Sequence, residues 1–95
     1  MRTYYVVTYD ISDDKRRDKV FRTLLGFGDH AQYSVFFCEL NAEELIRLRA
    51  RLRDLVHHRE DQVLIVELGR ATRALATSID VVGRAYDPPV RTIVV

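Results

Sequence analysis

A lone aspartate stands where the chain is expected to leave a strand and enter a helix. Asp10 directly follows a β-branched and aromatic run at residues 3–9, and a helical pattern begins shortly after it. A carboxylate at such a junction would lie at the sheet edge near a helix N-terminus, where anions and phosphates also bind. An aspartate at a strand end is also a common turn or cap residue, so the position alone leaves both interpretations open.

Basic side chains crowd the next helical turns. They are Lys15, Arg16, Arg17 and Lys19, with Arg22 beyond. A carboxylate beside basic side chains that bind phosphate suits a phosphodiester held next to a hard metal ion. Mg²⁺ is commonly bound through one or two carboxylates, and waters and substrate phosphates complete its shell. The alternative is a solvated helix face whose lysine and arginine side chains form ion pairs with neighbouring aspartates.

The elements that must position these residues follow from the apolar patterning. Strand signals of different strength cover residues 3–9, 32–40, 62–68, 78–82 and 92–95. Residues 69–77 are interpreted as a short helix or an irregular connector. Two helices fill the remaining gaps between the strong strands.

Cap residues define where these helices begin and end. The first is predicted from residue 13 to about 27, with Ser12 as its cap and Gly28 as its end. The second begins after its cap Asn41, and Glu44 stands three residues on in capping-box position.

This order of elements predicts an α+β fold, the ferredoxin-like split βαβ sandwich. In that fold two helices cover one face of an antiparallel sheet. The length suits a single domain over residues 1–95, with a core at 1–83. We expect the C-terminal strand segment at 84–95 to dock on a partner subunit.

Both faces of the predicted sheet are apolar. The first strand places Tyr5 and Val7 on one face and Tyr4 and Val6 on the other, whereas a sheet with one wet face alternates polar and apolar residues. Two helices cannot cover both faces, so we expect a homodimer packed sheet to sheet about a two-fold axis. A dimer axis near Asp10 would bring two carboxylates together. The alternative is a lid formed by the C-terminal part of the chain.

Composition narrows the class of protein. A net charge of +1 does not by itself indicate nucleic acid, but thirteen of the fifteen basic residues are arginine, whose planar fork binds phosphate at two points. A GC-rich genome would give the same bias. No apolar run reaches the roughly 18–20 residues that span a bilayer, so we expect no membrane partner. The single cysteine, Cys38, excludes a disulfide framework and fits a cytoplasmic location.

The histidines give weaker signals. His57 and His58 are adjacent in a polar loop and lack the spacing of a helical metal-binding pair. His30 precedes the second predicted strand, close to the expected position of Asp10. It is either a phosphate contact or an ordinary surface histidine.

Two motifs resemble the CRISPR-associated Cas2 family. Residues 9–17 read Tyr-Asp-Ile-Ser-Asp-Asp-Lys-Arg-Arg, and residues 32–36 read Gln-Tyr-Ser-Val-Phe. The resemblance is close over residues 1–40 and includes most of the chain by pattern and length. It implies a homodimer of ferredoxin-like subunits that takes part in spacer acquisition, bridges dimers of the Cas1 integrase and binds duplex DNA. It also implies a metal-dependent endonuclease acting on single-stranded RNA or double-stranded DNA.

The resemblance also implies roles for particular residues. Asp10 corresponds to the family's metal-binding aspartate, with Mg²⁺ as the expected ion and Mn²⁺ as the alternative. Arg17 and Phe36 match positions that matter for nuclease activity. The expected nucleic-acid contacts are Ser12, Lys15, Arg16, Lys19 and His30. Members often carry an arginine just ahead of Gln-Tyr-Ser-Val-Phe, and the neutral histidine found there in this chain would hold phosphate less firmly.

Three other functions stay open at this point. A non-catalytic architectural subunit would bind the DNA backbone through arginines of both helices, with a steep dependence on salt. A toxin-type ribonuclease of similar fold and a small-molecule-sensing domain are the further alternatives.

Overall fold

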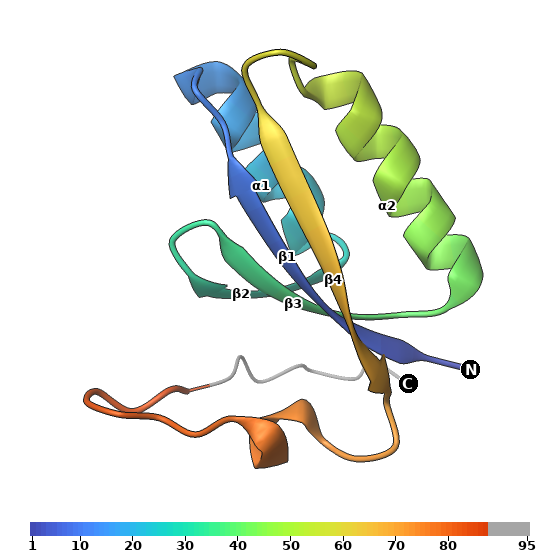
Figure 1. The fold of residues 1–95 in the computed structure, drawn as a ribbon, viewed down its shortest axis with the longest axis vertical. Helices are drawn as coiled ribbons and strands as arrows, with labels where there is room; N and C mark the ends of the chain where they lie inside the picture. Colours follow the sequence, from blue (N-terminus) through green and yellow to red (C-terminus); the bar gives the residue numbers. More distant parts are fainter. Residues whose placement is uncertain (88–95) are drawn as a thin grey trace.

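The chain folds as βαββαβ in a computed structural model that describes residues 1–87 (Figure 1). Its elements are β1 (Thr3–Asp10), α1 (Asp14–Leu25), β2 (Gly28–Gln32), β3 (Val35–Leu40), α2 (Ala42–Leu55), β4 (Gln62–Arg70) and η1 (Leu75–Ser78). The sheet is antiparallel with strand order β2-β3-β1-β4, and both helices lie on one side of it. This arrangement confirms the predicted ferredoxin-like α+β fold. Within the described residues, neither helix has the length and apolar character that a membrane crossing requires.

The core lies between the sheet and the two helices. Val7 of the central strand β1 pairs with Phe36 of β3 and Ile65 of β4, and both Val7 and Phe36 are fully buried. The helices complete this core with apolar pairs four positions apart, namely Val20 and Leu24 in α1 and Leu48 and Leu52 in α2. This burial holds β1, and with it the residue at its end, firmly in the middle of the fold.

Local hydrogen bonds decide where each helix begins. Asn41 caps α2 as predicted, because the Glu44 amide donates to Asn41 Oδ1 at 2.8 Å and the Asn41 amide donates to Glu44 Oε1 at 2.9 Å. The prediction that Ser12 caps α1 is wrong. Asp13 takes that position, since its Oδ2 accepts from the Arg16 amide at 2.9 Å. The Ser12 side chain is therefore available for another partner.

The first helix ends earlier than predicted because the chain enters another strand. The helix stops at Leu25 instead of running to residue 27, and Gly28 begins β2 instead of closing α1. A Cβ at Gly28 would overlap the Cys38 side chain and the Phe37 carbonyl, so glycine allows β2 to pack this closely on β3. Cys38 itself is buried, as its apolar run suggests.

The single strand predicted at 32–40 is instead part of a hairpin. β2 and β3 pair antiparallel, and a turn at Tyr33 and Ser34 joins them. Tyr33 has a φ of +28°, a backbone region that residues other than glycine seldom adopt. The sequence does not predict β2, because Gly-Asp-His-Ala carries little strand propensity and pairing with β3 decides its structure.

The C-terminal part contains a helical turn where part of a strand is expected. η1 ends at Ser78, and residues 79–87 form no strand, so the predicted strand at 78–82 is wrong. No strand of the described sheet pairs with these residues, and Gly83, with a φ of +95°, turns the chain directly after them. The strand predicted at 92–95 lies outside the described residues.

The sheet face without helices is only partly covered. Residues 71–87 run along that side (Figure 1). There the Tyr4 hydroxyl donates to the Arg73 carbonyl at 2.5 Å, and the rings of Phe37 and Tyr86 meet edge to face at 6.1 Å. Three apolar side chains of β4, here called the β4 strip, are about half exposed: Leu64 (49%), Val66 (48%) and Leu68 (50%). The tail therefore covers one part of the face, as the lid alternative expects, and leaves the β4 strip open.

Candidate active site

Asp10 is the exposed last residue of β1. It pairs with Gln62 of β4 on one side, whereas the register of β3 on the other side extends only to Thr8. Strand alternation puts the Asp10 side chain on the face of Val6 and Thr8, which is the face without helices. The carboxylate therefore stands at the end of the open face, on the same side of the sheet as the β4 strip.

One carboxylate per chain limits the metal ions that this position could hold. Among residues 1–87, no three His, Cys, Asp or Glu side chains gather in an arrangement suited to an ion. Mg²⁺ does not need such a cluster, since one or two carboxylates with waters and substrate phosphates suffice. Asp10 therefore fits the donor set of Mg²⁺ and does not form a complete all-protein cage.

The loop after Asp10 is fastened to the α2–β4 loop through Asp61. The Asp61 carboxylate accepts from Arg16 Nε (2.8 Å) and Nη2 (3.2 Å), from the Ser12 amide (3.2 Å) and hydroxyl (3.3 Å), and from the His57 amide (2.8 Å). Its side chain is completely buried beneath these donors. We call this set the Asp61 clamp. Ser12 and Arg16 are thus engaged inside the protein, and their contact with nucleic acid stays a prediction.

The same contacts set the charges within the Asp61 clamp. The Arg16 hydrogen bond holds the pKa of Asp61 well below its usual range against the opposing effect of burial, and the His57 and Ser12 amides add to the lowering. Asp61 in turn raises the pKa of Arg16. The amide of Arg16 also lowers the pKa of the cap residue Asp13. The carboxylate and the guanidinium of the clamp are therefore both ionised at neutral pH.

Arg17 braces the same loop from the helix side. Its Nη1 donates to the Ile11 carbonyl at 3.0 Å, and its Nη2 pairs with Asp14. Ile11 is buried, so the loop is anchored by an apolar side chain as well as by these polar contacts. The Arg17 side chain stays 44% exposed and can still reach a bound group.

Phe36 and His30 form an aromatic cluster beneath the hairpin turn. The buried Phe36 ring lies 5.5 Å from Phe21 and 5.0 Å from His30, measured between centroids. His30 lies 4.9 Å from Phe21, and its Nε2 donates to the Tyr33 carbonyl at 2.6 Å. Phe36 can therefore support the site only by packing, and His30 fixes the turn with one of its ring nitrogens.

Among the basic side chains expected to contact nucleic acid, the two lysines have the fewest interactions within the protein. Lys15 and Lys19 are exposed on α1, and neither forms an ion pair within the described part of the chain. Arg22, in contrast, pairs with Asp18 at 3.1 Å.

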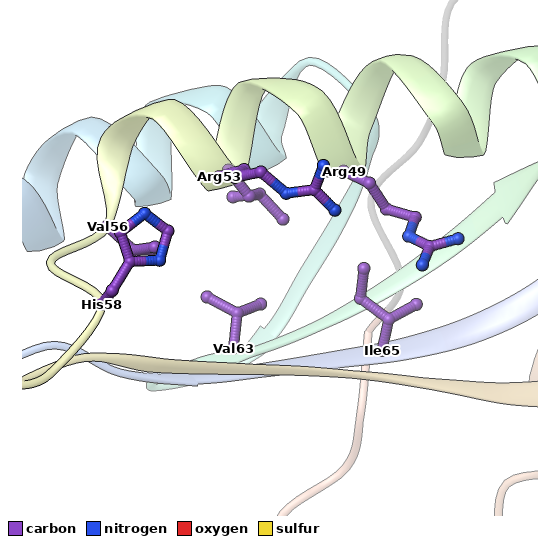
Figure 2. Close-up of a pocket in the computed structure, with 7 residues that line it drawn as sticks. Arg49, Arg53, Val56, His58, Val63 and Ile65 are labelled. Atoms are coloured by element: carbon purple, nitrogen blue, oxygen red, sulfur yellow. The ribbon is translucent and has the colours of Figure 1, made fainter.

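A second group of basic side chains borders a groove between α2 and β4. Figure 2 shows Arg49 and Arg53 reaching from α2 toward the side of β4 that carries Val63 and Ile65. His58 stands at one end, and the volume is about 230 Å³. The sequence indicates an arginine-rich helix but not the groove, because the apolar floor comes partly from a different element.

Sequence reasoning also misses the Asp61 clamp and the exposed position of Tyr33 in the hairpin turn. A signal for Asp61 exists in the sequence. If residues 3–9 pair antiparallel with residues 62–68, then Asp61, just before the second of these strands, lies beside the residues that follow Asp10. No comparable signal distinguishes Tyr33, whose aromatic side chain suggests an ordinary strand position.

Comparison with known proteins identifies the family to which this architecture belongs. Residues 1–74 match the family model described as CRISPR associated protein Cas2. The chain belongs to the CRISPR-associated Cas2 family. The match includes β1, α1, the hairpin, α2 and β4, and it confirms the resemblance carried by the motifs around Asp10 and Phe36.

Cas2 relatives resemble this chain over its whole length. The CRISPR-associated endoribonuclease Cas2 of Geobacter sulfurreducens is 37% identical over 95 residues, which are 100% of this chain and 99% of that protein. A crystal structure of Cas2 has a TM-score of 0.74 and 31% identity, covering 99% of this chain and 100% of that one. A hypothetical protein from Thermus thermophilus has a TM-score of 0.77 and 34% identity, covering 94% and 100%. Sequence and fold therefore agree on the Cas2 family.

Proposed function

We propose that this Cas2 family member is a metal-dependent endonuclease that acts as a homodimer in the acquisition of CRISPR spacers. The observation that carries the proposal is the exposed Asp10 carboxylate at the end of the open sheet face. The relative from Geobacter sulfurreducens bears the name of an endoribonuclease, which supports phosphodiester cleavage as the reaction class. Single-stranded RNA and double-stranded DNA are the two candidate substrates.

A second copy of the chain is the proposed cover of the β4 strip. The half-exposed Leu64, Val66 and Leu68 give the two copies an apolar surface through which to associate. If the two open faces met about a two-fold axis near Asp10, the second copy would contribute the second carboxylate. Residues 84–95 would then dock on the partner subunit, and Tyr86 would also keep its contact with Phe37 of its own chain.

Asp10 would hold Mg²⁺, or alternatively Mn²⁺, between the two copies. When bound, the ion would stabilise charge on the phosphate and lower the pKa of a bound water. Arg17 would orient the scissile phosphate, because its guanidinium is fixed at Ile11 and still half exposed. Lys15 and Lys19 would attract the nucleic-acid backbone on either side of the scissile phosphate. His30 and the solvent-facing atoms of Ser12 and Arg16 would add further contacts.

Basic side chains on α2 support a second candidate function. A non-catalytic architectural subunit would bind the DNA backbone through groups such as Arg49 and Arg53 at the rim of the α2–β4 groove. It would also bridge dimers of the Cas1 integrase. Binding of this kind falls steeply with salt, because phosphate contacts release counterions. Both roles can exist in one dimer.

Asp10→Asn tests the catalytic proposal. We expect cleavage of RNA or duplex DNA in Mg²⁺ to fall by about a hundredfold or more, since the metal supplies several kcal/mol of charge stabilisation. Asp54→Asn, which removes an exposed carboxylate from α2, serves as the matched control and should cleave normally. Equal cleavage by wild type and Asp10→Asn would reject the catalytic role. Loss of DNA binding in Arg49→Ala and Arg53→Ala without loss of cleavage would support the architectural role separately.

A further inference from the structure

The hairpin turn presents an aromatic ring to solvent in an unusual way. Tyr33 is 94% exposed, although Phe36, three residues on in β3, is fully buried. Its φ of +28° lies in a region that glycine adopts freely and tyrosine does not. The requirements of the turn alone would therefore favour glycine, and the tyrosine side chain calls for another explanation.

The turn that carries Tyr33 is held from below. The His30 ring donates to the Tyr33 carbonyl at 2.6 Å and packs against Phe21 and Phe36. The Tyr9 amide donates to the Ser34 carbonyl at 3.1 Å, which ties the turn to β1. The backbone that carries the exposed ring is thus fixed, so little conformational freedom is lost when a ligand stacks on the ring.

A cleft of about 410 Å³ separates this turn from the first turns of α1. Such a volume lies within the range of about 300–1,000 Å³ that is usual for ligand pockets. Tyr33 and Ser34 line one wall, and the facing wall and floor are formed by Tyr9, Asp14, Arg17, Asp18 and Phe21. The lining therefore combines aromatic rings with carboxylates and one guanidinium.

Each charged side chain that lines the cleft is in an ion pair, one of them with a residue outside the lining. Arg17 pairs with Asp14, and Asp18 pairs with Arg22 at 3.1 Å. Inside the cleft a phosphate would meet the carboxylates of Asp14 and Asp18, so the interior does not suit a strongly anionic group, and the scissile phosphate proposed at Arg17 would lie outside it. A flat, uncharged group with amino donors suits it well, because the ring can stack on tyrosine while the donors reach carboxylate oxygens. Nucleobases have this chemistry.

We infer that Tyr33 is the stacking platform for an unpaired nucleobase bound in this cleft. The inference rests on the proposed nucleic-acid function and names the part of the ligand that the cleft takes. The base must be unpaired, because a base within a duplex is stacked on both faces and cannot reach a protein ring without being extruded. Tyr9 lines the cleft, and Asp10, the next and last residue of β1, lies on the opposite face of the sheet, so a strand whose base is held here would reach the carboxylate by passing around the end of β1.

Binding of a labelled RNA single strand, measured in EDTA so that no metal-dependent cleavage occurs, tests this inference. We expect Tyr33→Gly to weaken the binding about tenfold and Tyr33→Phe to keep it, because phenylalanine preserves the stacking surface. A duplex of the same sequence should bind wild type and Tyr33→Gly equally. Tyr33→Gly should also melt at a higher temperature than wild type, since glycine relieves the positive φ. A loss of binding could then not be attributed to misfolding.

Ile46→Ala is the matched control, since it removes an exposed apolar side chain from α2 on a different element and should bind normally. Unchanged single-strand binding by Tyr33→Gly, an equal loss in Tyr33→Phe, or no binding by wild type would each overturn the inference. Cleavage by Asp10→Asn separates the two proposals. Loss of cleavage there with unchanged Tyr33→Gly binding rejects the base platform alone. Tyr33-dependent binding without any Asp10-dependent cleavage rejects the nuclease alone.

Discussion

At the scale of single residues, the candidate site depends on side chains that fix a loop. Arg17 holds the Ile11 carbonyl from α1, and Asp61 holds Ser12 from the α2–β4 loop. The motif around Asp10 is readable from the sequence because its residues are consecutive. The contribution of Asp61 is harder to read there, because four of its five hydrogen bonds come from Ser12 and Arg16 and depend on an antiparallel register between distant segments.

Asp61→Asn should lower stability and change its dependence on pH. The pKa of Asp61 is depressed in the folded protein relative to about 3.9 in the unfolded chain. At pH values between the depressed folded-state pKa and the unfolded-state pKa, the unfolded chain binds more protons than the folded protein. The contribution of Asp61 to the free energy of unfolding is therefore full above about pH 5 and is lost as pH falls below about 4. Urea unfolding over a pH series should therefore show a lower midpoint at neutral pH and a shallower acid decline in the variant. The exposed Asp54→Asn should behave as wild type, and an Asp61→Asn curve parallel to wild type would contradict the role of the Asp61 clamp.

At the scale of elements, the hairpin shows why local propensity is not sufficient. β1 and β4 are predictable because they are continuous runs of β-branched, aromatic and other apolar residues, and α2 is predictable because its apolar residues recur at the period of a helix. β2 lacks that pattern and exists because it pairs with β3, where Gly28 fits against Cys38. The extended run around residues 78–82 has a strand's composition but no partner strand within the described residues, and it forms no strand.

Gly28→Ala should destabilise the protein by about 1–3 kcal/mol, because the added Cβ would overlap the Cys38 side chain and the Phe37 carbonyl. Gly26→Ala offers the matched control. Gly26 has a φ of −77°, and its nearest neighbour is a helix carbonyl 3.3 Å from an added Cβ. Chemical denaturation of the two variants measures the difference. Equal midpoints would show that the approach of β2 to β3 is not tight.

At the scale of the whole molecule, the open sheet face links stability to function. Counting apolar residues on both faces of the predicted strands is enough to anticipate a face that two helices cannot cover. The partial cover by residues 71–87 could not be assigned in advance, because it depends on contacts such as that between Phe37 and Tyr86. What stays exposed is the β4 strip, on the face that also carries Asp10.

Val66→Glu should separate the proposed dimer into folded monomers, because it introduces a charge into the apolar strip that the second copy would bury. Ile46→Glu places the same charge on an exposed position of α2 and should leave the assembly unchanged. Sedimentation velocity reports the mass, and circular dichroism checks that each variant is folded. A wild-type protein that sediments as a monomer at all concentrations would refute the homodimer.

Nucleic-acid cleavage by wild type, Asp10→Asn and Val66→Glu, measured at one chain concentration, tests the central claim that two copies of Asp10 form one site. The account predicts that wild type cleaves in Mg²⁺ and that Asp10→Asn is dimeric and inactive. It also predicts that Val66→Glu, although folded and still carrying Asp10, is inactive as a monomer. A monomeric Val66→Glu that cleaves at the wild-type rate would contradict the shared site.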